Sequence, residues 1–251
     1  MHKLQTLVKD APDIYDLLRE QLSSWQSTDE LAQSCAITFM NPYSYLLLRR
    51  SPEVLEQLTA VYCDAITSAR LSSLCLGKTI PRISFDYGSL AKTFFTQLDK
   101  YKVPMYFFGS DPDALERSYQ VFTQSYPNLK VVGKQHGYYA ESEYISILQQ
   151  IVASGAKFVV IGLGTPKQDQ AAVDLVRLAR TEGKHIHCFT CGGFLTQSAD
   201  KLQYYPEWIN RFHLRWLWRV LHERHVLGRL LKEYPKFFGK FIKDLYSGRR
   251  R

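Results

Sequence analysis

The sequence has no apolar run long enough to cross a membrane. Its 251 residues contain no window of about 18 uninterrupted apolar side chains, which is the minimum for a transmembrane helix. The first 21 residues also lack the continuous apolar segment of a secretory signal, because charged side chains are scattered through them. These two absences lead us to expect a cytoplasmic protein.

Cysteine is scarce and odd in number, with five residues in the chain (Cys35, Cys63, Cys75, Cys188 and Cys191). This usage fits reduced thiols better than a disulfide framework. The segment HIHCFTC, residues 185–191, combines two histidines with two cysteines and is a conceivable zinc site. Alternation along a strand would put Cys188 and Cys191 on opposite faces, and no second pair completes a tetrahedral set. We therefore expect a structural strand there and no metal.

The two common nucleotide-binding fingerprints are also missing. The stretch GLGTPKQ, residues 162–168, lacks the third glycine of G-x-G-x-x-G and the G-K-[ST] of a nucleoside-triphosphate loop. It retains Lys167 and backbone N–H groups at the start of an expected helix, which together attract an anion. A phosphate site is one interpretation of this stretch, but the motif is too short to establish it.

Acidic residues are rare near the C-terminus. The net charge is +8, yet residues 211–251 hold twelve Lys/Arg and only three Asp/Glu, so the rest of the chain is nearly neutral. This asymmetry indicates an anionic partner for the C-terminal segment alone.

The same segment has the pattern of amphipathic helices. Leucine and aromatic residues recur at three- and four-residue spacing, and basic residues from Arg229 to Lys243 follow a different face. Pro235 is expected to divide the pattern into two helices. A helix that packs on the core and exposes a charged face is the simpler alternative. The aromatic content and the charge favour an anionic membrane surface (Phe212, Trp216, Trp218, Tyr234, Phe237, Phe238, Phe241, Tyr246).

Between about residues 36 and 200, short apolar runs alternate with helical patterns. This alternation predicts an α/β fold, with a Rossmann-like, mostly parallel sheet flanked by helices and a basic amphipathic helical appendage at the C-terminus. We expect a catalytic core over residues 1–200, its two halves forming a cleft, and a membrane-docking segment over 201–251. The expected strands are 36–40, 103–109, 128–133, 157–164 and 185–193, and the expected helices are 43–60, 88–100, 111–125, 142–154 and 167–182.

Ligands bind such sheets in the loops at the carboxyl ends of the strands. Several residues of the sequence fall in loops of that kind, and they are candidate binding residues (Asn41, Gly109, Gly137, Gly162, Gly164, Gly192 and Gly193).

The segment SDPDALE, residues 110–116, contains two carboxylates, Asp111 and Asp113, at the spacing used by metal-dependent sugar transferases. The spacing also fits a helix start with Ser110 as N-cap, Pro112 in the first turn and Asp113 closing a capping box. We favour the helix start and predict no metal.

Asp64 stands in VYCDAITSARL, after what reads as the end of an apolar helix. A lone Asp in such a place is usually a turn or N-cap residue. In a cleft, the same carboxylate is able to take a proton from an attacking hydroxyl. The pattern alone does not choose between the two.

Taken together, the motifs resemble the WecG/TagA/CpsF family of glycosyltransferases from about Ile37 to Arg229. The family shows Asn at a strand end, as in FMNP, then an Asp that matches Asp64 and an Arg that matches Arg82. The most specific part runs from Tyr126 to Asp169 and includes YPNLKVVGKQHGYY and SGAKFVVIGLGTPKQD. A double glycine and the segment LRWLWR, residues 214–219, follow.

The resemblance implies an inverting transfer of a sugar from a UDP-sugar to a polyprenyl-diphosphate-linked saccharide in surface polysaccharide synthesis. It implies Asp64 as the general base and a donor site at the glycine loops with Pro166, Lys167 and Gln168. It also implies that the basic C-terminal segment docks on the inner membrane face and closes over the site. It assigns to the acceptor, the diphosphate or the membrane Arg82, Arg219, Arg224 and Arg229. We add Arg215, from the same basic segment, as a further candidate.

Three departures from the family pattern bear on the sugars rather than the fold. The family's basic pair before the last segment is replaced by Gln203, Tyr204 and Tyr205, the Glu of its LEW motif is Arg215, and the Glu after PKQ is Asp169. Ala65 also stands where Gly usually follows the catalytic Asp.

We expect no cofactor beyond the UDP-sugar substrate, and no nucleic-acid partner, since the basic segment has no recognised nucleic-acid-binding motif. The alternative to an enzyme is a catalytically silent scaffold of the same fold on the membrane surface.

Overall fold

The computed structural model describes residues 3–202, 209, 218, 220 and 224–247. Its centre is a six-stranded, all-parallel sheet in the order β2-β1-β6-β5-β3-β4. The predicted parallel α/β fold is therefore confirmed. The strands are β1 (Cys35–Met40), β2 (Ala60–Cys63), β3 (Met105–Gly109), β4 (Val131–Gln135), β5 (Phe158–Gly162) and β6 (His187–Thr190).

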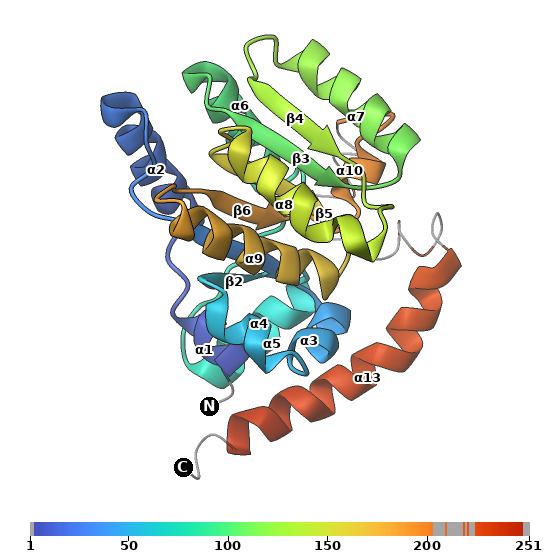
Figure 1. Ribbon diagram of the computed structural model, residues 1–251. Helices are drawn as coiled ribbons and strands as arrows, with labels where there is room; N and C mark the ends of the chain where they lie inside the picture. Colours follow the sequence, from blue (N-terminus) through green and yellow to red (C-terminus); the bar gives the residue numbers. More distant parts are fainter. Residues whose placement is uncertain (1–2, 203–208, 210–217, 219, 221–223, 248–251) are drawn as a thin grey trace.

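Helices cover both faces of this sheet (Figure 1). One face packs against α1, α3, α4, α5, α8, α9 and α13, and the other against α2, α6, α7 and α10. Their bounds are α1 (Lys3–Lys9), α2 (Ile14–Thr28), α3 (Pro42–Leu48), α4 (Pro52–Gln57), α5 (Ile66–Leu76), α6 (Leu90–Tyr101), α7 (Pro112–Ser125), α8 (Tyr144–Ala153), α9 (Lys167–Thr181), α10 (Phe194–Gln197) and α13 (Arg224–Ser247), with a 3-10 turn at Glu141–Glu143.

The prediction of one continuous helix over 43–60 is wrong, because the helix is interrupted after Leu48 and ends at Gln57. The chain forms two short helices, α3 and α4, and then strand β2. Pro52 begins the second helix, since a proline fits the first turn of a helix and disfavours its interior. The four residues of β2 are all buried, so they show none of the alternation that identifies a half-exposed strand.

The segment HIHCFTC is a strand, as expected, and its two cysteines serve opposite sides of the sheet. Cys188 belongs to the core cluster that contains Val159 and Ile161, whereas Cys191 packs against the cluster that contains Val160 and Phe189. Burial raises the pKa of Cys191 to about 12, which keeps it a neutral thiol.

The prediction that Pro235 divides the C-terminal segment is also wrong. Pro235 lies inside the 24-residue helix α13, which Figure 1 shows as a curved helix passing beside α3. The residues that anchor the helix to the core, Phe237 and Phe241, follow the proline and are almost fully buried. Tertiary packing of this kind overrides a local preference worth about 3 kcal/mol.

Core packing also accounts for part of the aromatic content that the sequence assigned to a membrane. Phe237 and Phe241 contact the ring of Tyr45 on α3 rather than solvent. A separate row of apolar side chains on α13 is exposed, and so are four lysines (Leu227, Leu231, Phe238, Ile242, Tyr246; Lys232, Lys236, Lys240, Lys243). Within the described part of the chain, no helix combines the length and apolarity needed to span a bilayer.

Candidate active site

The carboxyl ends of the six strands open into one cleft of about 1490 Å³. Such an edge is where parallel sheets bind ligands, because the strands end there and the loops into the helices begin. The cleft is lined by ten of the predicted site residues (Asn41, Asp64, Arg82, Gly137, Gly162, Gly164, Lys167, Gln168, Gly192 and Gly193). Residues far apart in the sequence thus meet at one edge of the sheet.

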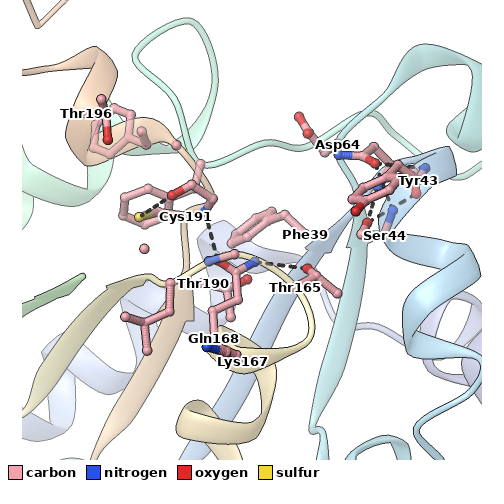
Figure 2. Close-up of a pocket in the computed structure, with 18 of the residues that line it drawn as sticks. Phe39, Tyr43, Ser44, Asp64, Thr165, Lys167, Gln168, Thr190, Cys191 and Thr196 are labelled. Carbon is pink, nitrogen blue, oxygen red and sulfur yellow. Dashed lines mark hydrogen bonds between the residues drawn. The ribbon is translucent and has the colours of Figure 1, made fainter. Parts of the chain in front are cut away.

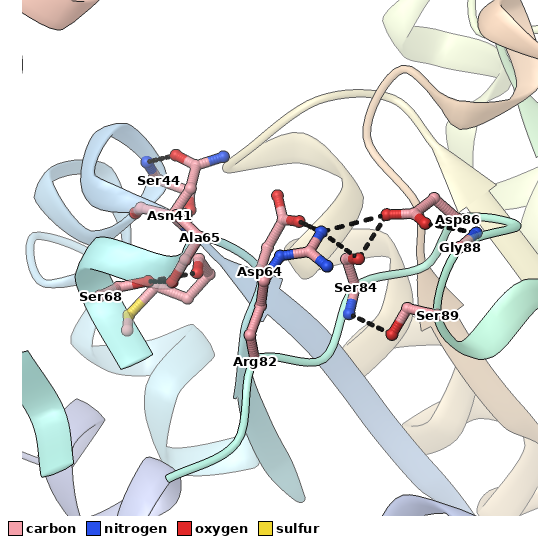
Figure 3. A network of polar contacts seen from close by, with 11 residues as sticks. Asn41, Ser44, Asp64, Ala65, Ser68, Arg82, Ser84, Asp86, Gly88 and Ser89 are labelled. Atoms are coloured by element: carbon pink, nitrogen blue, oxygen red, sulfur yellow. Dashed lines mark hydrogen bonds and ion pairs between the residues drawn. The ribbon is translucent and has the colours of Figure 1, made fainter. Parts of the chain in front are cut away.

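Asp64 directly follows β2, and its backbone N–H donates to the carbonyl of Met40 at 2.8 Å. Helix α5 has Ala65 as its N-cap, so the Asp64 carboxylate does not cap that helix. The carboxylate is one-third exposed, and its Oδ1 lies 3.7 Å from Nη2 of Arg82 (Figure 3). Asp64 is therefore an open carboxylate in the cleft with a cation beside it.

Asn41 caps helix α3 at the end of the neighbouring strand. Its Oδ1 accepts hydrogen bonds from the N–H groups of Tyr43 and Ser44, both at 3.0 Å. The capping box is completed by the Ser44 hydroxyl, which accepts from the Asn41 N–H at 2.9 Å. This places a rigid loop next to Asp64.

Gly109 is required by close approach of two loops. Its φ is +134°, and an added Cβ would lie 2.4 Å from the carbonyl of Gly162. Gly109 itself does not line the cleft, but the following Ser110 does, and the Ser110 hydroxyl lies 2.9 Å from that of Thr196. The absence of a side chain at Gly109 therefore allows the loops after β3 and β5 to lie in close contact.

Gln168 connects the loop that contains Gly164 with the loop that contains Gly192. Its Oε1 accepts from the N–H of Gly164 at 3.2 Å and from the N–H of Gly192 at 3.1 Å (Figure 2). Only 4 % of the surface of Gln168 is exposed, so its main effect on the cleft is to hold the two glycine loops in place. These two amides are engaged within the protein, and the N–H groups of Gln168, Asp169 and Gln170 at the start of α9 donate to the carbonyls of Gly164 and Pro166. Lys167 and the dipole of the 15-residue helix α9 remain to attract an anion.

Pro166 lies just outside the lining of the cleft. It is the N-cap residue of α9 and is joined to Thr165 by a cis peptide bond. Thr165, whose hydroxyl accepts a hydrogen bond from Nε2 of Gln168 at 3.3 Å, does line the cleft.

Asp169, the departure from the family Glu, is fully buried beneath the loop. Its Oδ1 accepts from the hydroxyl of Thr38, which in turn lies 2.9 Å from the hydroxyl of Thr190. Burial raises the pKa of Asp169 to about 6, against the hydrogen bonds from Thr38 and Thr165. The Asp169 carboxyl thus links the start of α9 to Thr38 of β1, and through Thr38 to Thr190 of β6, from inside the core.

The helix start after β3 is confirmed, but the cap is Asp111 rather than Ser110. Asp111 Oδ1 accepts from the N–H of Ala114 at 2.9 Å, while Ser110 adopts a positive φ of 64°. Ser110 carries the turn that redirects the chain after Gly109, so the residue after it begins the helix. Among the described residues, no group of three His, Cys, Asp or Glu side chains is arranged to hold a metal ion.

Of the basic residues expected from the C-terminal segment, Arg215 and Arg219 lie outside the described residues. Arg224 and Arg229 fall on α13, but their side chains lie outside what the structure describes. Tyr234 of the same helix lines the cleft, which brings the C-terminal segment to the site. The family resemblance implies that the C-terminal segment closes over the site, but no motif of the sequence singles out Tyr234.

Sequence reasoning missed several other polar and aromatic residues of the cleft. Ser84 and Asp86 come from the loop before α6, Tyr43 from the first turn of α3, and Glu141 from the 3-10 turn. Tyr138 and Tyr139 end the motif YPNLKVVGKQHGYY, but the sequence did not single them out as site residues. Ser84 and Asp86 stand close to Arg82 in the sequence, and that proximity was the available signal.

Comparison with known proteins agrees with this geometry. A profile described as glycosyl transferase WecG/TagA/CpsF family matches residues 10–251. The chain belongs to this family. It is 32% identical over 241 residues to the UDP-Gal:alpha-D-GlcNAc-diphosphoundecaprenol beta-1,4-galactosyltransferase of Shigella boydii, and the match covers 96% of this chain and 95% of that protein. The resemblance read from the sequence motifs is confirmed. In this member of the family, Asp64, Arg82, Lys167 and Gln168 line one cleft.

Proposed function

We propose that this protein transfers a sugar from a UDP-sugar to a saccharide linked to a polyprenyl diphosphate, with inversion at the anomeric carbon. The observation that carries the proposal is the position of the Asp64 carboxylate. It lies in the same cleft as Lys167 and the glycine loops, so a base and an anion-binding loop face one space. The family membership and the activity named for the Shigella boydii relative support a lipid-linked acceptor.

In the proposed reaction, the Asp64 carboxylate removes the proton from the acceptor hydroxyl. The hydroxyl oxygen attacks the anomeric carbon from the side opposite the diphosphate, and the bond from that carbon to the diphosphate oxygen breaks. The electron pair leaves with UDP, and one glycosidic bond replaces another. General-base assistance of this kind contributes about 10²–10⁴ in rate.

The leaving UDP gains negative charge as the bond breaks. Lys167 and the N-terminus of α9 face the cleft and would stabilise that charge where it develops. The mechanism uses the protein's own cations and requires no metal.

The donor sugar is a hexose or an N-acetylhexosamine. The galactosyl donor of the Shigella boydii relative makes UDP-galactose the first substrate to test. Two departures from the family pattern lie at or beside the cleft: Ala65 lines it, and the buried Asp169 follows the lining residue Gln168. They are the reason to test other sugars beside galactose.

The protein would meet its acceptor at the inner face of the cell membrane. The exposed row of α13 presents Leu231, Phe238 and Ile242 to solvent, at spacings of seven and four that keep them on one helix face. The four exposed lysines occupy the neighbouring face. This arrangement suits a helix lying in the plane of an anionic membrane.

The experiment that tests the proposal measures transfer from UDP-galactose, UDP-glucose and their N-acetyl counterparts to a polyprenyl-diphosphate-linked N-acetylglucosamine. We expect transfer with one of them and inverted anomeric configuration by NMR. The Asp64→Asn variant should lose activity by about 10²–10⁴ while folding and binding UDP as the wild type does. Near-wild-type turnover by that variant would falsify the assignment of the base.

A further inference from the structure

Arg82 lies between two carboxylates, and the second one belongs to Asp86. Nη2 of Arg82 is 3.3 Å from Oδ2 of Asp86 but 3.7 Å from Oδ1 of Asp64. Figure 3 shows the guanidinium between the two acids, with Ser84 beside it. The cation of the site is thus held more closely by Asp86 than by Asp64.

Asp86 is itself fixed in place. Its Oδ1 accepts from the N–H of Gly88 at 2.8 Å, and its Oδ2 accepts from the hydroxyl of Ser84. The Ser84 hydroxyl also accepts from Nη2 of Arg82 at 2.6 Å. The carboxylate, the hydroxyl and the guanidinium therefore form one network, with both oxygens of Asp86 engaged.

The backbone around Arg82 is equally anchored. Arg82 forms a parallel bridge with Cys63 at the end of β2, and the N–H of Ile83 donates to the Cys63 carbonyl at 2.9 Å. Asp64 follows Cys63, so Arg82 enters the site from the segment alongside the base. From there its side chain would be free to close on Asp64 if nothing else held it.

We propose that Asp86 is a positioning residue that holds Arg82 away from a closed ion pair with Asp64, so that Asp64 remains able to accept the acceptor's proton. The inference rests on the proposed role of Asp64 as base. A carboxylate that engages a guanidinium with both oxygens is a weaker base, because the cation favours its charged form. Asp86 supplies a competing negative charge, which keeps the Arg82 guanidinium from engaging both oxygens of Asp64.

All the charged side chains that line the cleft contribute to the pH dependence of the reaction (Asp64, Arg82, Asp86, Asp111, Glu141 and Lys167). Of these, Asp86 is bonded to Arg82 and Asp111 caps helix α7. Removing the charge of Asp86 therefore changes the balance at Arg82 directly.

The test compares Asp86→Asn with the wild type. The amide keeps its oxygen for the Gly88 N–H and presents its NH₂ group, which is not an acceptor, to Arg82, so the guanidinium should move toward Asp64. We expect kcat to fall on the order of tenfold, with UDP affinity and the KM for the donor unchanged. The acid limb of the kcat profile should move about one pH unit lower, since an opposite charge that comes closer lowers the pKa of a carboxyl.

If Asp86→Asn fails to fold, Ser84→Ala tests the same network, because it removes only the hydroxyl that links Arg82 to Asp86. It should show the same changes to a smaller extent. The matched control is Asp13→Asn, which alters a carboxylate that accepts two backbone N–H groups at the start of α2 and lies outside the cleft. Its kcat and pH profile should equal those of the wild type.

Wild-type kcat and an unshifted profile in both network variants would overturn the inference, and so would a loss of kcat matched by a loss of UDP affinity. Failure of the proposed function is distinguishable, because then the wild type itself would not transfer sugar or Asp64→Asn would remain active.

Discussion

Arg49 and Asp244, which are 195 residues apart, join helix α3 to helix α13 through a two-point ion pair. Nη2 of Arg49 lies 2.6 Å from Oδ1 of Asp244, and Nε lies 2.8 Å from Oδ2. The hydroxyl of Tyr45 donates to Oδ2 of the same carboxylate at 2.9 Å. Since Asn41, which lines the cleft, caps the N-terminus of α3, this contact joins the C-terminal helix to the element that borders the candidate active site.

Asp244→Ala should loosen α13. The Asp244 side chain is only 6 % exposed, and its removal leaves the guanidinium of Arg49 and the buried hydroxyl of Tyr45 without their acceptor. We expect the free energy of unfolding to fall by about 3 kcal/mol. Hydrogen exchange should rise over residues 237–245 before it rises in the sheet.

The control is Lys236→Ala, which breaks an exposed ion pair with Glu233 on the same helix. It should change the unfolding free energy by less than about 0.5 kcal/mol. Equal effects of the two substitutions would contradict a special role for Asp244.

Gly109→Ala should be among the most damaging single-methyl additions in the chain. The new Cβ would meet the backbone of Gly162 at 2.4 Å, at a φ of +134°. Gly77→Ala is the matched comparison, because Gly77 also has a positive φ, of +65°, but no atom within 4 Å of the added Cβ. We expect about 1–2 kcal/mol from Gly77→Ala and a clearly larger loss from Gly109→Ala, measured by chemical denaturation. Equal losses would mean that backbone strain alone matters at both sites.

Asp169 should make the protein less stable as the pH rises. Its pKa lies near 6 in the folded state, above the ordinary 3.8, so the folded protein binds the extra proton between these values. The stability that this group contributes is present below pH 4 and is lost as the pH rises to about 6, to an extent on the order of 3 kcal/mol. Asp169→Asn keeps an acceptor for Thr38 and removes the titration.

Unfolding free energies of the wild type and Asp169→Asn, measured from pH 4 to pH 7, should therefore diverge in favour of the variant. Parallel curves would show that the carboxyl titrates normally despite its burial.

The exposed apolar row of α13 should contribute to membrane binding beyond its charge. Replacing Leu231, Phe238 and Ile242 by Ser removes apolar side chains that are 69 %, 40 % and 42 % exposed. We expect affinity for anionic vesicles to fall tenfold or more, and the remaining binding to depend more steeply on salt. The control is Leu74→Ser on α5, an 83 % exposed leucine on a different helix. Unchanged vesicle binding by the triple variant would leave the lysines as the whole interaction.

Local sequence patterns were sufficient to predict the class of fold and the position of the glycine loop before α9. Strand 158–162 and helix 167–181 could be predicted from local periodicity and from the glycines between them, as 157–164 and 167–182. Their alternation leaves a parallel sheet as the simplest solution. The family could also be recognised, because its most specific motif occupies one continuous stretch from Tyr126 to Asp169.

Which of these residues lie together in the cleft could be seen only in the folded protein. Strand β2 escaped recognition because it is short and buried on both faces, and Asp64 takes its meaning from ending that strand beside Arg82. The continuity of α13 through Pro235 depends on Phe237 and Phe241 packing against α3, and Asp86 matters only because the fold brings a guanidinium between two acids. The local sequence pattern indicates which secondary structure a segment prefers. Burial and contacts between residues distant in the sequence determine where that segment packs and which side chains it brings to the cleft.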